Sequence, residues 1–262
     1  MSSEAPKQPA IEQNKVRMLV AQAAGRIGAV VTRRLAEFAA RGRNVSLKTI
    51  LCYGDSNTWG APPHGGRRFD SNVRWAGVLR NTLGADYFVI EEGLGGRTTV
   101  WDDPIEGFKN GKTYLQPCLD SHTPLDLVII MLGTNDLKKR FSLSPFDIAA
   151  GAGVLVDMVM NSKAGLDWQY APAVLLICPP PTADLSKIAP EFSYFADMFE
   201  GAETKSQRLS VHYARVAQER GCHFLDAGTV IRTSTYDGIH LEAEAHQKLG
   251  LAVAEKVKAI LG

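Results

Sequence analysis

Apolar and polar positions alternate along the chain in blocks that predict strands and helices in turn. Five short apolar runs have the length and composition of buried strands. They cover residues 49–53, 87–91, 125–132, 173–178 and 223–226. Four segments carry apolar residues at helical spacing, namely 73–83, 145–160, 206–219 and 242–260. From Leu47 onward this alternation indicates an α/β domain with a parallel, doubly wound sheet.

The third run is the most apolar and predicts the centre of that sheet. Residues 127–132 read Leu-Val-Ile-Ile-Met-Leu without a polar interruption. A parallel strand of this kind is covered by helices on both faces. We therefore expect it inside the sheet, and we expect the polar turns that follow the strands to lie together at one edge.

The first 46 residues differ in pattern from the rest of the chain. We interpret them as an N-terminal extension, residues 1–46, to a main domain of residues 47–262. Residues 1–14 are polar and lack periodicity, so they are expected to be disordered.

Residues 16–46 are expected to form one strand, at 16–21, and one amphipathic helix, at 29–41. The turn between them resembles the G-x-x-G-x-x-G loop of short NAD(P)-binding Rossmann domains, with Gly25 and Gly28 at its second and third glycine positions. The first position lacks glycine, and no second βαβ unit with an acidic ribose-binding residue follows. Dinucleotide binding is therefore the alternative. The favoured interpretation is an assembly element that packs on the main domain or on a partner subunit.

Composition and charge exclude several classes of function. The 262 residues carry a formal net charge of +1, which gives no case for nucleic acid or an acidic membrane as partner. No apolar stretch reaches the roughly 20 residues that span a bilayer, and the N-terminus lacks the pattern of a signal peptide. The four cysteines include no C-x-x-C pair, so no zinc or thioredoxin-type site is expected. We expect a cytoplasmic protein with no metal and no cofactor.

Two long loops interrupt the alternation, and loops of this length in a compact domain usually have a function. Residues 60–72 are rich in Gly, Pro and Arg, and residues 179–203 carry a group of aromatic side chains. These aromatics are expected either to wall a substrate pocket or to be buried against a neighbouring subunit. The sequence leaves both possibilities open.

Polar turns at the ends of the first and last strands offer the groups of a nucleophilic serine site. Ser56 ends a G-D-S turn directly after the first strand, where open α/β sheets bind ligands. Asp237 and His240 begin and end a D-G-I-H turn after the last strand. Histidine titrates near neutrality and suits a general base. His240 is therefore the candidate base for Ser56, and Asp237 is the candidate carboxylate that orients its ring.

Two further turns supply candidate donors for an oxyanion. Gly96 follows the second strand and offers a backbone N–H with no side chain to block it, and Asn135 follows the third strand and offers a side-chain amide. With the backbone N–H of Ser56 they make three donors. The order Ser, Asp, His is that of the α/β-hydrolases, but no G-x-S-x-G elbow surrounds Ser56, which disfavours that fold.

These four blocks resemble, in the same order, the four blocks of the SGNH (GDSL-type) hydrolases. The segments E-E-G-L and R-T-T around the second block, and the strand that leads into G-T-N-D, are similar to the bacterial arylesterase/acyltransferase branch. The resemblance covers residues 47–262. It implies a flavodoxin-like, three-layer α/β/α sandwich with a five-stranded parallel sheet, and a homo-oligomer.

The resemblance also implies an activity and the residues that carry it. Ser56 would be the nucleophile, His240 the base and Asp237 its orienting acid, with Ser56, Gly96 and Asn135 forming the oxyanion hole. The expected enzyme is a metal-free serine esterase that hydrolyses short-chain acetyl or aryl esters through an acyl-enzyme on Ser56. Acyl transfer to alcohols is a second expected outcome, and the expected partner is a small-molecule ester.

Three residues are expected to contact the substrate. Asn57 stands where the family usually has Leu after the nucleophile. It borders the acyl site by this comparison, so we expect specificity to depend on it. Trp59 and Trp101 flank the site from two turns, where they are expected either to line an acyl or alcohol pocket or to cap the core.

Four other polar residues near the blocks are expected to have no chemical role. Asp55 should brace the serine loop by hydrogen bonding, and Asp136 should be structural. Arg97 is expected to be an ion-pair partner within the fold. His246 is six residues from His240, on a different helix face, and is expected to be solvated.

Overall fold

The most apolar strand lies at the centre of a five-stranded sheet, as the sequence predicts. The computed structural model describes residues 47–262, and its parallel strands lie in the order β2-β1-β3-β4-β5. The strands are β1 (Lys48–Gly54), β2 (Tyr87–Gly93), β3 (Leu127–Met131), β4 (Ala173–Cys178) and β5 (His223–Asp226). Every residue of β3 is buried. All five strands coincide with predicted apolar runs to within a few residues at each end.

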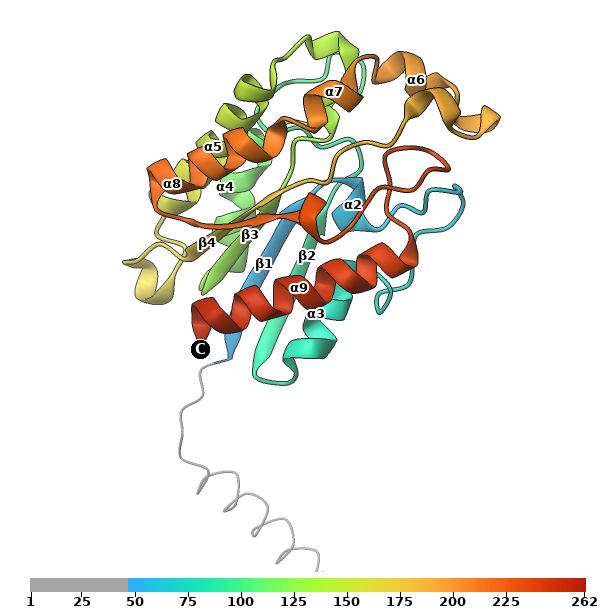
Figure 1. Ribbon diagram of the computed structural model, residues 1–262. Coiled ribbons are helices and arrows are strands. Elements are labelled where there is room, and N and C mark those ends of the chain that lie inside the picture. Colours follow the sequence, from blue (N-terminus) through green and yellow to red (C-terminus); the bar gives the residue numbers. More distant parts are fainter. Residues whose placement is uncertain (1–46) are drawn as a thin grey trace, which may run out of the picture. The chain divides into compact units, whose positions relative to one another are not determined.

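Helices cover both faces of this sheet, as Figure 1 shows. The α-helices are α2 (Ser56–Trp59), α3 (Trp75–Leu83), α4 (Gly111–His122), α5 (Pro145–Met160), α6 (Tyr194–Met198), α7 (Ala202–Ser206), α8 (Leu209–Arg220) and α9 (Ala243–Leu261). Helices α3 and α9 pack together on one face, and α4, α5 and α8 cover the other. The expected three-layer α/β/α sandwich is confirmed.

Strand β1 contributes to both hydrophobic layers because successive side chains point to opposite faces of a strand. Ile50 packs in the cluster that contains Trp75 of α3. Leu51, the next residue, packs in the cluster that contains Leu115 of α4. This strand ends at the serine loop, so the nucleophile candidate is anchored from both sides of the sheet.

Helix α4 has no counterpart among the predicted helices. It carries Pro117 in its interior, and proline removes a helical hydrogen bond and normally stops a helix. The helix forms because Asn110 caps it by accepting from the backbone N–H of Lys112, and because Leu115 and Leu119 are fully buried. Tertiary packing here overrides the local signal. The short helices α6 and α7 likewise lie in or beside the segment that we expected to be an irregular loop.

Several expectations about the N-terminal extension lie outside the described residues. These are the strand at 16–21, the helix at 29–41, the glycine turn between them and the disorder of residues 1–14. Within residues 47–262 the four cysteines are free thiols, and Cys52 and Cys178 are buried. No helix in this part of the chain has the length and apolar character needed to cross a membrane.

Candidate active site

Ser56 is the first residue of helix α2, directly after the carboxyl end of β1. Asp55 caps this helix, and its carboxylate accepts a hydrogen bond of 2.9 Å from the backbone N–H of Asn57. Burial raises the pKa of the Asp55 carboxyl from 3.8 to about 6, although this hydrogen bond and the nearby His240 act in the opposite direction. The bracing role expected for Asp55 is thus seen. The backbone N–H of Ser56 belongs to the first turn of a helix, where N–H groups have no partner within the helix.

His240 lies between Ser56 and Asp237 and contacts both. Its Nε2 atom is 3.0 Å from Oγ of Ser56, and its Nδ1 atom is 2.5 Å from Oδ2 of Asp237. The other oxygen of Asp237 accepts from the backbone N–H groups of Ile239 and His240, each at 2.9 Å. Asp237 is fully buried. Because the carboxylate is held at both oxygens, it fixes the orientation of the imidazole ring.

Gly96 and Asn135 lie in the turns after β2 and β3. Gly96 has φ = +80°, a conformation that favours glycine, and a Cβ atom there would meet the Glu106 carboxylate at 2.6 Å. Asn135 is 6% exposed and begins a short 3₁₀ helix, Asn135–Leu137. Its Nδ2 atom donates to the carbonyl oxygen of Arg97 at 3.1 Å. An amide nitrogen carries two hydrogens, so one remains for a ligand.

Among residues 47–262, Arg97 has no ion-pair partner, contrary to our expectation. It is 2% exposed, and its Nη1 atom donates to the carbonyl oxygens of Gly54 and Glu92 at 2.8 and 2.5 Å. Its guanidinium group lies over the rings of Tyr53 and Tyr114, at 4.1 and 5.4 Å from their centroids. Backbone carbonyl groups at strand ends are strong acceptors. The sequence pattern does not reveal which side chain reaches them.

Asp136 is structural, as expected. Its carboxylate accepts from the backbone N–H and the hydroxyl of Thr99, which ties the turn after β3 to the turn after β2. Burial raises the pKa of this carboxyl to about 6, against the effect of the Thr99 hydrogen bonds.

The three residues expected to contact substrate occupy different environments. Asn57 is 2% exposed, and its Nδ2 atom donates to the carbonyl oxygen of Ile239 at 3.3 Å. This places its side chain between the turn that holds Ser56 and the turn that holds His240. Trp59 is half-buried beneath the guanidinium group of Arg68. Trp101 is 37% exposed and keeps a free surface.

His246 is buried and not solvated, contrary to our expectation. It lies on the face of α9 that packs against α3, and its Nδ1 atom accepts from the backbone N–H of Trp75 at 3.2 Å. Burial lowers the pKa of its ring from 6.5 to about 4. The expectation placed both histidines on one helix, but α9 begins at Ala243, so His240 precedes it, and His246 faces α3 and not solvent.

With this geometry in view, comparison with known proteins identifies the family. A family model described as the GDSL-like lipase/acylhydrolase family matches residues 52–248. The chain belongs to this family. The expected SGNH (GDSL-type) resemblance is therefore confirmed. A search of curated proteins found no match.

Solved structures of related GDSL-like hydrolases agree with this assignment. An aryl esterase from M. smegmatis is 48% identical to this chain, with a TM-score of 0.76 over 82% of this chain and 100% of its own. A carbohydrate acetylesterase from Sinorhizobium meliloti is 45% identical, with the same TM-score and coverage. A lipase/acylhydrolase from Enterococcus faecalis, at 16% identity and a TM-score of 0.56 over 81% of this chain and 96% of its own, shares the fold. This GDSL-like hydrolase is a carboxylic ester hydrolase of the serine type.

Two further residues of this hydrolase lie near the site, and the sequence contained a signal for the second but not for the role of the first. One is the buried Arg97, which joins the turns after β1 and β2. The other is Phe195 of α6, whose ring centroid lies 6.1 Å from that of His240. The cluster of aromatics in residues 179–203 was the available signal for Phe195, since one expected role of that cluster was to wall the site.

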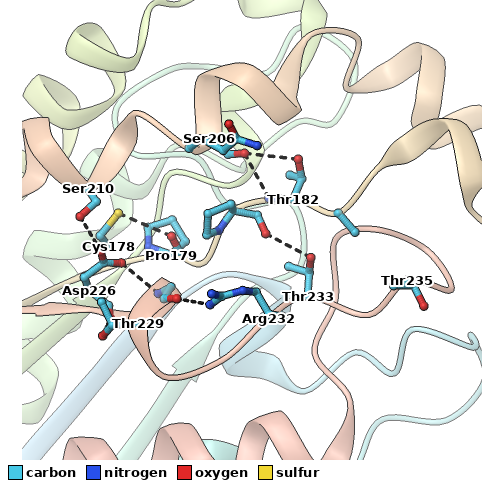
Figure 2. Close-up of a pocket in the computed structure, with 14 residues that line it drawn as sticks. Cys178, Pro179, Thr182, Ser206, Ser210, Asp226, Thr229, Arg232, Thr233 and Thr235 are labelled. Atoms are coloured by element: carbon cyan, nitrogen blue, oxygen red, sulfur yellow. Dashed lines mark hydrogen bonds between the residues drawn. The ribbon is translucent and has the colours of Figure 1, made fainter.

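A cavity of about 500 Å³ lies at the carboxyl ends of β4 and β5. Figure 2 shows Arg232 and several hydroxyl groups around it, with Ser210 donating to Asp226 and Thr233 donating to a backbone carbonyl. No residue that we expected to be catalytic lines this cavity. The hydroxyl groups of Thr182 and Ser206, which also line it, lie 3.3 Å apart, within hydrogen-bonding distance.

Proposed function

We propose that Ser56, His240 and Asp237 form the catalytic triad of an esterase that acts on short-chain acetyl or aryl esters. The observation that carries the proposal is the continuous line of contacts from the Asp237 carboxylate through the His240 ring to Oγ of Ser56. A nucleophile within hydrogen-bonding distance of a base, with that base oriented by an acid, is the arrangement that activates serine.

In the first half of the reaction, His240 removes the proton from Oγ of Ser56 as this oxygen attacks the ester carbonyl. The negative charge that develops on the carbonyl oxygen is stabilised by the backbone N–H groups of Ser56 and Gly96 and by the second amide hydrogen of Asn135. His240 then protonates the leaving alkoxide, and the acyl group remains on Ser56. In the second half, His240 takes a proton from water or an alcohol as its oxygen attacks the acyl carbonyl. The acyl–Oγ bond then breaks, and His240 returns the proton to Oγ of Ser56 as the acid or the new ester leaves.

The acyl and alcohol groups that we propose for the substrate are inferred from the related structures and from the residues around the site. The related structures at 45–48% identity are named as an aryl esterase and a carbohydrate acetylesterase, which favours small acyl groups. Phe195 offers aromatic surface beside His240, and Trp101, in the loop after β2, is 37% exposed. We propose that they contact the ester and that alcohols compete with water for the acyl-enzyme.

Other parts of the proposal concern assembly and location. We propose a homo-oligomer and a cytoplasmic location, and we propose that residues 1–46 act in assembly, with dinucleotide binding as the alternative. Light scattering on the full chain and on a chain that begins at Leu47 tests the assembly role. An unchanged number of subunits would contradict it.

The test of the catalytic assignment is the burst of p-nitrophenol from p-nitrophenyl acetate. Ser56→Ala should abolish both the burst and the steady-state rate, because no acyl-enzyme forms. Ser186→Ala, at an exposed position outside the site, is the matched control and should behave as the wild type. A burst that persists in Ser56→Ala would refute the assignment. Adding an alcohol and measuring the ester formed separates acyl transfer from hydrolysis.

A further inference from the structure

A sulfur, a nitrogen and an oxygen ligand converge beside the turn that follows β2. Cys118 and His122 lie on α4 and Glu92 lies on β2, and their candidate ligand atoms are all within 4.8 Å of one another. Nε2 of His122 is 3.0 Å from Oε1 of Glu92. The spacing of four residues puts Cys118 and His122 on one face of the helix. Within residues 47–262 this is the single group of three such ligands that lie so close together.

The cluster is shielded but reachable from solvent. Cys118 is fully buried, whereas the side chains of His122 and Glu92 are 27% and 23% exposed. Glu92 and Tyr114 also line a cavity of about 730 Å³. Tyr114 precedes Cys118 by four residues on the same helix face. An ion can therefore enter from the cavity, with water or the Tyr114 phenol as its fourth ligand.

We propose that Glu92, Cys118 and His122 form a binding site for a thiophilic divalent cation such as Zn²⁺ or Cd²⁺. A thiolate, an imidazole and a carboxylate are ligands that tetrahedral zinc accepts. The thiolate selects against Mg²⁺ and Ca²⁺, which prefer oxygen ligands only. The sequence did not indicate this site, because Glu92 joins the two helical residues only through the fold.

Binding replaces a proton on sulfur with the metal. Cys118 is a free, buried thiol. The S–H bond breaks, the S–metal bond forms, and one proton passes to solvent. Arg97 lies near the sulfur and weakens the attraction for a cation. Its guanidinium group is turned to the carbonyls of Gly54 and Glu92 and does not occupy the site.

The site is separate from the proposed catalytic residues. None of its three ligands takes part in the contacts that join Ser56, His240 and Asp237. Metal binding can therefore be measured without an assay of ester hydrolysis. It neither supports nor weakens the catalytic assignment.

Titration of the full chain with Cd²⁺ tests the proposal, because a cadmium–thiolate bond gives an ultraviolet charge-transfer band. We expect one equivalent of Cd²⁺ to develop this band in the wild type and in Cys222→Ser, which removes another free thiol. Cys118→Ser should not develop it. A wild type without the band, or a band that persists in Cys118→Ser, overturns the proposal. Thermal unfolding of each variant verifies that it is folded.

A second variant distinguishes a three-ligand site from simple reaction of one thiol with metal. His122→Ala removes a partly exposed ligand and leaves the buried sulfur in place. We expect this variant to bind Zn²⁺ more weakly than the wild type by isothermal titration calorimetry. His212→Ala, on the surface of α8, should bind Zn²⁺ as the wild type does. Equal affinities for wild type and His122→Ala would show that His122 is not a ligand and would overturn the proposed site.

Discussion

Nδ2 of Asn135 lies 3.1 Å from the carbonyl oxygen of Arg97 and donates to it. Asn135, a proposed oxyanion donor, is thus held by Arg97, the residue that follows Gly96. Gly96 and Asn135 are the two proposed donors that lie outside the turn of Ser56. The guanidinium group of Arg97 also donates to the carbonyl oxygen of Gly54, two residues before Ser56. One buried arginine therefore sets the relative positions of all three turns that carry proposed oxyanion donors.

We expect Arg97→Lys to lower kcat by about 10²-fold, because a lysine cannot reproduce the planar fork and small displacements of catalytic groups have effects of this size. The KM should change much less. Steady-state kinetics with p-nitrophenyl acetate measures both values. Arg80→Lys, on the partly exposed surface of α3, is the control. A normal kcat in folded Arg97→Lys would contradict the positioning role.

Replacement of Asp237 by asparagine tests how the imidazole is oriented. Asp237→Asn retains an oxygen for the two backbone N–H groups but presents an NH₂ group to Nδ1 of His240. This favours the tautomer that carries its proton toward Ser56, so kcat should fall by about 10⁴-fold, as in other serine triads. Asp184→Asn, at an exposed loop position, should have no effect. A loss of less than tenfold would mean that Asp237 does not orient the base.

The parallel sheet explains why the proposed catalytic residues were predictable. Ser56 and His240 are 184 positions apart, yet both follow strands whose carboxyl ends lie at one edge of the sheet. Strand periodicity and order were sufficient to predict that edge and the central position of β3. The 3.0 Å contact between Nε2 and Oγ depends on the conformations of two loops, which periodicity does not describe.

The features that were missed depend on contacts between distant segments. Arg97 donates to carbonyl groups at the ends of β1 and β2, and a charged residue in a polar segment gives no sign of these contacts. His246 is buried because α3 covers the first turn of α9, although its position in the sequence is among polar residues. Helix α4 carries Pro117, a residue that normally stops a helix, and packing of its apolar face stabilises it.

Substitution of Asn57 tests whether this residue determines acyl specificity or positions the two catalytic turns. Its side chain is almost wholly buried and donates to the carbonyl oxygen of Ile239, next to His240. We expect Asn57→Ala to loosen the contact between the two loops and to lower kcat by about tenfold for acetyl and butyryl esters alike. The ratio of kcat/KM for the two esters should stay constant. A changed ratio would mean that Asn57 contacts the acyl group, as the family comparison led us to expect.

His246 should make the stability of the fold dependent on pH. Burial, with a smaller effect of the nearby His240, lowers the pKa of its ring from 6.5 to about 4. Because the folded-state pKa is below the unfolded value, the neutral ring stabilises the fold above pH 6.5. This stabilisation is lost as the pH falls toward 4. Between pH 7 and pH 5 the expected loss is about 2 kcal/mol of unfolding free energy.

His246→Asn removes this titration and retains an acceptor for the backbone N–H of Trp75. Urea unfolding at pH 7 and pH 5 should therefore show a loss about 2 kcal/mol smaller in the variant than in the wild type. Asp55 and Asp136, whose raised pKa values of about 6 favour the fold at lower pH, contribute equally to both proteins and cancel in the comparison. Equal losses in the two proteins would show that burial does not lower the pKa of His246 in the folded protein.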